Sequence, residues 1–260
     1  MGLLLSPKLY PTTPSEIKCK IINELIPFLT RNTSAIMIRI GDFDISEENA
    51  IKYINYKYEI ERNQTYILNI NRDEDEIWKS FNINARRNIR KFEKMGCRIE
   101  VDMSNKFINE FYERAIYAFS KNGTKPSFSK KKLKILFKNL AYTEMFVAAK
   151  ACSPEGEVIG TIVSAGYGIS TFLGGYSFKE HYHFFPNEAL QWFIIKYWKS
   201  KGVIYYDLAG GGNYKEKYRP DKRVVISIRY FKFRIIKKAF ECCKKIYYGL
   251  RRFLFLKQIR

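Results

Sequence analysis

Residues 144–176 read EMFVAAKACSPEGEVIGTIVSAGYGISTFLGGY, and this stretch decides the fold. It contains three runs in which β-branched, aromatic and small apolar residues predominate, a composition typical of β-strands. The runs are residues 144–152, 158–167 and 169–176. Only the turn sequences SPEG, at residues 153–156, and YG, at residues 167–168, separate them. Because such short connections join antiparallel neighbours, the stretch predicts a three-stranded meander.

Helices are predicted on both sides of this meander along the chain. Before it, apolar residues recur at steps of three and four between residues 104 and 120, and a shorter helix is predicted for residues 129–139. After it, we expect a helix over residues 187–201, a strand at residues 203–208 and a last strand at residues 224–233. This order predicts an α/β protein, in which helices cover both faces of a mixed sheet.

The composition indicates a globular protein with an acidic partner. Of the 260 residues, 46% are apolar and 16% are aromatic, which excludes a wholly disordered chain. Lysine and arginine number 46 against 26 acidic residues, so the net charge is +20 at pH 7. Such a charge favours a ligand that carries phosphates, a nucleic acid or an anionic membrane. The sign of the charge does not choose among these partners.

The sequence predicts neither a metal centre nor a membrane-spanning helix. Its five cysteines show no CxxC spacing and it has two histidines, His181 and His183, so no zinc-binding set can be assembled. No apolar run approaches the roughly 20 residues of a membrane-spanning helix. Residues 1–10 contain too short an apolar stretch for a signal peptide. We therefore expect a protein of the reducing cytoplasm.

Four cations lie within about two turns of a helix that is predicted for residues 84–94. They are Arg86, Arg87, Arg90 and Lys91. Arg86 and Arg90 share a face because they are four residues apart, and Arg87 lies three residues before Arg90. A cluster of this kind can bind phosphates. The alternative interpretation is a solvated basic face, which the spacing alone favours somewhat.

Asp207 lies at the end of the strand predicted for residues 203–208, directly before Gly210, Gly211 and Gly212. The carboxyl ends of strands are where α/β sheets usually bind ligands, and glycines let a ligand approach the backbone. Asp207 is therefore a candidate general base, or a candidate group for positioning an amine. An aspartate before glycines can equally cap a turn, and the sequence leaves both interpretations open.

Aromatic and basic residues alternate in the following segment, residues 214–219, which reads YKEKYR. Cations beside phenol rings suit a ligand that carries phosphates, through charge and ring contacts together. The alternative is an exposed loop in which Tyr214 and Tyr218 pack inward, and we expect this for at least one of the two tyrosines.

The C-terminal tail is strongly basic. Residues 229–260 contain eleven lysines and arginines and one acid, Glu241, which gives a net charge of +10. Apolar residues follow a helical stripe opposite these cations. We expect an amphipathic helix over residues 235–256 that lies on the inner face of an anionic membrane. The alternative is that the stripe packs onto the domain while the cations are solvated.

In order and spacing, these elements resemble the FemAB-like acyltransferases of the GNAT fold. The resemblance covers about residues 65–233. It rests on the basic helix between Trp78 and Gly96, on Gly160 and the Gly174-Gly175-Tyr176 run of the meander, on PNEALQW at residues 186–192, and on residues 202–211. The coenzyme A loop of the wider fold, Q/R-x-x-G-x-G/A, is absent.

The resemblance implies both a fold and a reaction. It implies a GNAT-like, largely antiparallel mixed sheet in residues 71–233 and a partial GNAT-like half-domain in residues 1–70. The basic amphipathic helix that the tail pattern predicts completes the division with residues 234–260. The reaction implied is transfer of an acyl or aminoacyl group to an amine of a cell-envelope or sugar precursor. The donor would be acyl-coenzyme A or aminoacyl-tRNA, used as a co-substrate with no bound cofactor or metal.

The family's F-K-x-x-F-like element resembles residues 214–218, with tyrosine at both ends. Lys215 is accordingly the candidate for contacting a donor phosphate or the reacting carbonyl, and Asp207 is the candidate base or amine-positioning group. Acyl transfer itself needs a positioned amine and a stabilised oxyanion, and it needs no side-chain nucleophile. The helix start at Asn187, which is predicted to cap the helix, is a candidate anion site. The candidate donor-binding residues are Arg86, Arg87, Arg90, Tyr176, Asn187, Gly210, Gly211 and Tyr218.

A non-catalytic protein that binds RNA or a membrane surface through the same cations is the alternative function. Such a binding protein would need no aspartate at the glycine turn.

Overall fold

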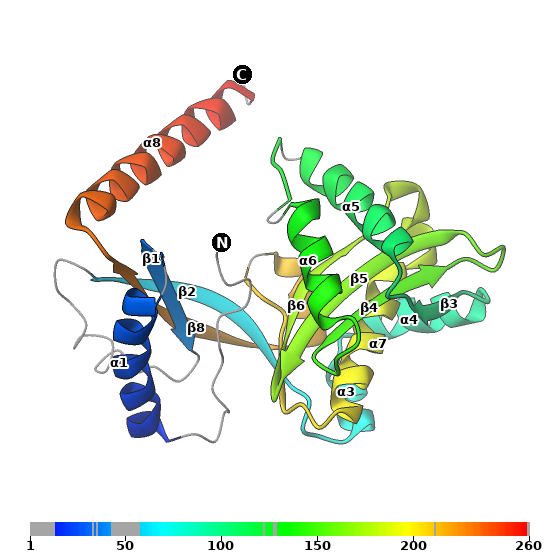
Figure 1. Ribbon diagram of the computed structural model, residues 1–260. Helices are drawn as coiled ribbons and strands as arrows, with labels where there is room; N and C mark the ends of the chain where they lie inside the picture. Colours follow the sequence, from blue (N-terminus) through cyan, green and yellow to red (C-terminus); the bar gives the residue numbers. More distant parts are fainter. Residues whose placement is uncertain are drawn as a thin grey trace. The chain divides into compact units, whose positions relative to one another are not determined.

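The computed structural model of the chain describes residues 14–32, 34, 36–42, 58–121, 123–126, 129–210 and 212–258 (Figure 1). The chain divides into two compact units. The smaller unit consists of Met1–Asn63 and Val224–Arg260, and the larger consists of Gln64–Arg223. The three-part domain division expected from the sequence stays a prediction.

The larger unit holds the meander and its flanking helices. Its elements are the second part of β2 (Tyr58–Asn69), α3 (Glu74–Ser80), α4 (Ile83–Lys94), β3 (Arg98–Val101), α5 (Asn105–Ser120), α6 (Lys130–Leu140), β4 (Phe146–Cys152), β5 (Val158–Tyr167), β6 (Ile169–Tyr176), the 3-10 helix η1 (Lys179–Phe184), α7 (Pro186–Ser200), β7 (Tyr205–Asp207), the 3-10 helix η2 (Asn213–Tyr218) and the start of β8 (Asp221–Phe231). The smaller unit holds α1 (Ser15–Asn32), β1 (Met37–Asp42), the remaining parts of β2 and β8, and α8 (Arg234–Gln258).

The strands form one sheet in the order β1-β8-β2-β7-β6-β5-β4-β3. The pairs β1–β8, β2–β7, β3–β4, β4–β5 and β5–β6 are antiparallel, whereas β6 and β7 are parallel. The predicted meander is therefore confirmed as β4, β5 and β6. The mixed, largely antiparallel sheet with surrounding helices also confirms the predicted fold class.

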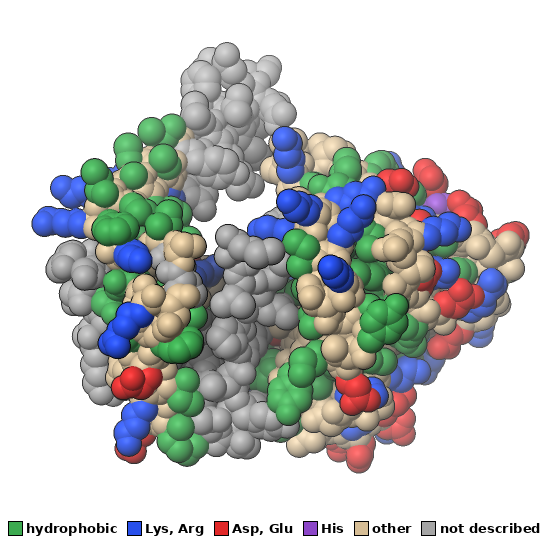
Figure 2. Space-filling model, in the orientation of Figure 1, with side chains coloured by type: hydrophobic (Ala, Val, Ile, Leu, Met, Phe, Trp, Pro, Cys, Tyr) green, Lys and Arg blue, Asp and Glu red, His purple; other side chains and the backbone are tan. Residues whose placement is uncertain are grey.

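β4 shows why helices cover both faces of this sheet. Adjacent residues of a strand point to opposite faces, and both Phe146 and Val147 are almost fully buried, at 1% and 0% exposure. The ring of Phe146 packs against Phe137 of α6, with centroids 5.1 Å apart. Val147 belongs instead to the core cluster that contains Trp198 of α7. In the space-filling view, Lys and Arg side chains gather over the region of α5 and α6 (Figure 2).

The start of α7 lies close to β5 because residue 160 is glycine. A Cβ atom at Gly160 would come within 2.9 Å of the Cβ of Pro186. Pro186 is the first residue of α7, where the fixed φ of proline suits a helix start. The N-cap is Phe185, with a left-handed φ of 59° and no side-chain capping bond. The prediction that Asn187 caps this helix is therefore wrong, because Asn187 lies in the first turn.

The tail forms the predicted helix, α8, whose described side chains extend to Ile246. Phe240 packs against Phe231 of β8, with ring centroids 5.6 Å apart, and the guanidinium of Arg229 lies 4.7 Å from the Phe240 ring. Ile235 remains 76% exposed. The described part of the helix therefore packs partly onto β8, and membrane binding by it stays a prediction. None of the described helices is long and apolar enough to cross a membrane.

The contact between α6 and the sheet gives a first prediction. The Phe137 ring lies between Phe107 and Phe146, at 5.7 and 5.1 Å between centroids, and its side chain is 4% exposed. We expect Phe137→Ala to lower the free energy of unfolding by about 3–5 kcal/mol, because it leaves a cavity in the core. Denaturant titration followed by circular dichroism measures this change. Ile116→Ala on α5, at 48% exposure, is the control and should change stability by less than about 1 kcal/mol. Equal effects of the two substitutions would contradict the packing.

Candidate functional site

A cavity of about 570 Å³ lies where α7 begins beside β6. Residues of α4, β5, β6, η1, α7 and η2 line it. Three of the predicted donor-binding residues are among them, namely Tyr176, Asn187 and Tyr218. Asn187 is fixed at the rim, because its Nδ2 donates a hydrogen bond to Ser177 Oγ at 2.8 Å. β6 also runs parallel to β7, so the cavity adjoins the parallel pair of the sheet.

Glu188 supplies the carboxylate among the described residues that line this cavity. Its Oε1 accepts hydrogen bonds from Lys217 Nζ at 2.8 Å and from Asn88 Nδ2 at 3.1 Å. The side chains of Glu188 and Lys217 are 14% and 21% exposed, so the ion pair is largely shielded from water. The sequence did not single out these three residues. An acid in the first turn of a helix is common, because it interacts favourably with the helix dipole.

Aromatic side chains form much of the cavity wall. Burial raises the pKa of Tyr176 to about 12, so its phenol stays protonated at neutral pH and can donate a hydrogen bond. Burial, with the negative charge of Glu188 adding to it, also raises the pKa of Tyr218. Tyr218 packs inward against Phe81, with ring centroids 5.2 Å apart. The sequence predicted inward packing for at least one of Tyr214 and Tyr218. Tyr214 is 57% exposed.

Asp207 caps the turn that follows β7. Its Oδ1 accepts hydrogen bonds from Thr65 Oγ1 at 2.6 Å and from the backbone N–H of Ala209 at 2.8 Å, and its side chain is buried. Gly210 is required in this turn, because a Cβ there would lie 2.7 Å from the carbonyl oxygen of Gln64. Asp207 and Gly210 are not lining residues of the cavity. The sequence left two interpretations of Asp207 open, and the bond to Ala209 shows that Asp207 caps the turn.

Lys215 is a buried cation beneath the same turn. It is 4% exposed, and its Nζ donates to two backbone carbonyl oxygens of the turn, those of Ala209 at 3.1 Å and Gly210 at 3.0 Å. Burial lowers the pKa of Lys215 to about 8, although the negative charge of Asp207 opposes this shift. Its Nζ also lies 5.6 Å from the ring centroid of Phe172, a residue of the cavity wall. Lys215 therefore lies behind the wall of the cavity.

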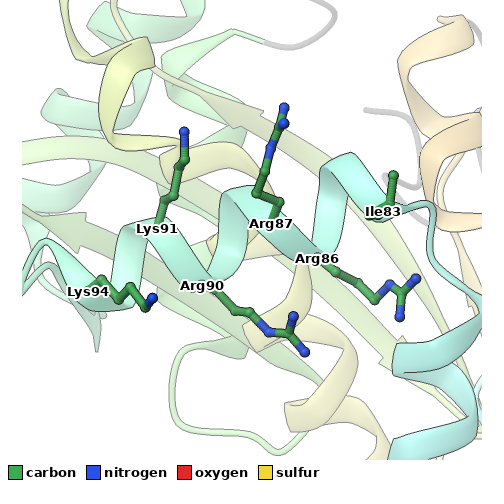
Figure 3. A pocket seen from close by; sticks show the side chains of 6 residues that line it. All are labelled: Ile83, Arg86, Arg87, Arg90, Lys91 and Lys94. Carbon is green, nitrogen blue, oxygen red and sulfur yellow. The ribbon is translucent and has the colours of Figure 1, made fainter.

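The basic helix α4 begins one residue earlier than predicted and presents two rows of cations. Figure 3 shows Arg86, Arg90 and Lys94 on one side of the helix and Arg87 and Lys91 on the other. These side chains border a hollow of about 440 Å³. The predicted shared face of Arg86 and Arg90 is thus present, and Arg87 belongs to the second row. Phosphate binding by this face stays a prediction.

Contacts of α4 connect this hollow with the cavity. Asn88 of α4 lines the cavity, and its Nδ2 donates a hydrogen bond to the carboxylate of Glu188. The ammonium of Lys91 lies 5.5 Å from the ring centroid of Phe185, which is another residue of the cavity wall. The guanidinium of Arg90 lies 5.5 Å from the Trp78 ring. A ligand with phosphates on α4 could therefore extend toward the cavity.

The structure thus distributes the predicted site residues over three neighbouring places, which are the cavity wall, the turn after β7 and the outer face of α4. Gly211 lies outside the described residues. Within the described part of the chain, no group of three or more His, Cys, Asp or Glu residues could hold a metal ion.

No known protein family matches the sequence, and no curated protein matches it either. Solved structures do match. The structure of FemX aligns with 86% of this chain and 79% of its own chain, at a TM-score of 0.68 and 14% identity. The fold is that of FemX. L-PGS from Bacillus licheniformis also matches, over 82% of this chain and 73% of its own, at a TM-score of 0.50 and 17% identity. The resemblance to the FemAB-like fold that the sequence showed is confirmed.

The buried position of Lys215 gives a second prediction. The unfolded chain holds the lysine proton up to about pH 10.5, whereas the folded chain releases it near pH 8. Raising the pH through this window therefore favours the folded state. We expect the unfolding free energy of the wild type, relative to that of Lys215→Met, to rise between pH 8 and pH 10.5. Denaturant titrations at several pH values measure it, and the tyrosines that both proteins share cancel in the difference. A difference that is independent of pH would show that the lysine is solvated.

Proposed function

We propose that this chain is an acyltransferase that moves an acyl or aminoacyl group from an activated carrier to an amine of a cell-envelope or sugar precursor. The carrier is acyl-coenzyme A or aminoacyl-tRNA, which acts as a co-substrate. The observation that carries the proposal is the cavity beside the parallel strands β6 and β7, because it combines a shielded carboxylate, a cation and protonated phenols in the fold of FemX.

The side chains of the cavity match what acyl transfer requires. A neutral amine attacks the carbonyl carbon of a thioester or ester, the new C–N bond forms, and the C–S or C–O bond to the carrier breaks. Glu188 is placed to hold the amine and to take its proton, which the leaving group then needs. In this proposal Lys217 and the phenol of Tyr176 stabilise the oxyanion, beside the aromatic side chains of the cavity wall.

Lys215 and Asp207 support this site from behind the wall. Lys215 is mostly charged at neutral pH, and it adds positive potential beside Phe172. Asp207 holds the turn whose carbonyl oxygens fix Lys215. The donor's phosphates lie on α4 in this proposal. A cytoplasmic protein that lies at the inner face of the membrane, with residues 235–256 in contact with it, would meet a lipid-linked acceptor.

Direct assay tests the function. The purified full chain is incubated with acetyl-coenzyme A, or with charged tRNA, together with a panel of amino sugars and peptidoglycan precursors, and products are detected by mass. We expect transfer to an amine from one of the two donor classes. Absence of transfer from both classes, with retained binding of RNA or of vesicles, would favour the non-catalytic alternative.

A third prediction distinguishes the roles of Glu188 and Asp207. Glu188→Gln should lower turnover by about 100-fold, because it removes the proton acceptor. Asp207→Asn keeps the Oδ1 acceptor of the turn, so we expect a smaller loss. Asp221→Asn, an exposed carboxylate at the start of β8, is the control. A 100-fold loss in Asp207→Asn, with an unchanged unfolding free energy and an active Glu188→Gln, would assign the role of base to Asp207.

A fourth prediction concerns donor binding by α4. Replacing Arg86 and Arg90 by glutamine should weaken donor binding roughly tenfold, since two partly exposed charge pairs contribute about 1–2 kcal/mol together. The loss should shrink as salt approaches about 0.15 M and beyond, because exposed charges are screened over roughly 8 Å there. Lys79→Gln on α3, outside the hollow, is the control. Unchanged affinity in the double variant would remove this face from the donor site.

A further inference from the structure

α6 carries a concentration of positive charge that the proposed reaction does not use. Its eleven residues, KKKLKILFKNL, contain five lysines and no acid. The lysines are Lys130, Lys131, Lys132, Lys134 and Lys138. The helix is well formed, with the Ser129 side chain accepting a hydrogen bond from the backbone N–H of Lys132.

Four of these lysines form one row along the outer side of the helix. With about 100° of rotation per residue, residues 130, 134, 138 and 131 fall within an arc of roughly 100°. The side chains of Lys131, Lys134 and Lys138 are exposed. The other side of the helix is apolar, and Leu133 and Phe137 are buried in the unit. We call Lys130, Lys131, Lys134 and Lys138 the lysine row.

The lysine row has no acidic partner among the residues that the structure describes. Other lysines of the larger unit pair with acids, for example Lys150 with Asp102 at 2.9 Å and Lys217 with Glu188 at 2.8 Å. No side chain of the lysine row has an ion pair or a hydrogen bond with any residue that the structure describes. Tyr142, two residues beyond the end of α6, is 98% exposed. The same region of Figure 2 shows Lys and Arg side chains gathered over α5 and α6.

We propose that the lysine row docks the larger unit onto an anionic phospholipid surface. The lysine row stays on one side of the helix, and residues 130–138 span about 12 Å along its axis, so the ammonium groups can lie within a Debye length of a flat surface at the same time. Juxtaposed lysines of this kind attract anionic headgroups without any specific geometry. An exposed tyrosine is suited to the membrane interface.

The choice of lysine distinguishes this surface from the face of α4. Arginine recognises individual phosphates through paired, planar hydrogen bonds, whereas lysine acts as a hydrated point charge. The hollow on α4 is bordered by three arginines, and α6 contains none. A diffuse anionic surface therefore fits the lysine row better than a defined nucleic-acid ligand does. The surface differs from α8, whose described part packs partly onto β8 through Phe240.

Sedimentation of the full chain with vesicles tests the proposal. One variant carries Lys131→Gln, Lys134→Gln and Lys138→Gln. The matched control carries Lys79→Gln, Lys106→Gln and Lys196→Gln, which removes the same charge from exposed positions of the larger unit outside α6. We expect binding to vesicles of phosphatidylcholine with phosphatidylglycerol, and none to phosphatidylcholine alone. The α6 variant should bind roughly 100-fold more weakly, because each lysine near the surface contributes about a factor of five, and the control variant should keep most of the affinity.

A charge-retaining variant completes the experiment. Replacing the same three lysines of α6 by arginine should preserve vesicle binding, and circular dichroism verifies that all variants are folded. The proposal is overturned if the full chain does not bind anionic vesicles, or if the α6 variant and the control variant lose affinity equally. It is also overturned if the α6 variant keeps its vesicle affinity and loses affinity for single-stranded RNA. None of these measurements depends on acyl transfer, so a failed activity assay leaves the outcome interpretable.

Discussion

Burial of the central strand β5 on both of its faces is the constraint on which the larger unit depends. Seven consecutive residues of this strand, from Ile159 to Ala165, are buried, so a helical layer is needed on each side. α7 supplies one layer, and it can approach only because Gly160 leaves room for Pro186. The place where α7 begins is thereby fixed, and the cavity lies at that place.

Two hydrogen bonds between buried polar side chains connect α7 to the sheet and keep these layers in register. Trp198 Nε1 of α7 donates to Ser164 Oγ of β5 at 2.8 Å, and Gln191 Nε2 of α7 donates to the phenol oxygen of Tyr206 at 2.7 Å. Each bond connects a helix to a particular strand position. A slip of α7 along the sheet would leave these buried groups without partners, at a cost of about 1–3 kcal/mol for each group. The walls of the cavity are therefore held in a defined arrangement.

The cavity and the turn after β7 use charge in different ways. In the cavity, the ion pair of Glu188 and Lys217 lies at a surface that a ligand can reach, and Asn88 links it to α4. In the turn, Lys215 donates hydrogen bonds to two backbone carbonyl oxygens, and burial lowers its pKa to about 8. A lysine in this setting organises the backbone and supplies potential to its surroundings, whereas the exposed cations of α4 and α6 face the solvent.

The local structure can be predicted from the sequence alone. Its alternating apolar runs and short turns set the meander, the three- and four-residue periodicity set α5, and the i to i+4 spacing placed Arg86 and Arg90 on one face of α4. These features depend on neighbours in the chain, so they can be read from it. The contacts of Glu188 with Lys217 and Asn88, which lie 29 and 100 residues away from it in the sequence, arise from the folded arrangement of the elements. The folded arrangement also makes Asp207 the cap of a turn, because its partner Thr65 is 142 residues distant. Contacts across such separations follow from how the sheet buries both of its faces, and no local pattern encodes them.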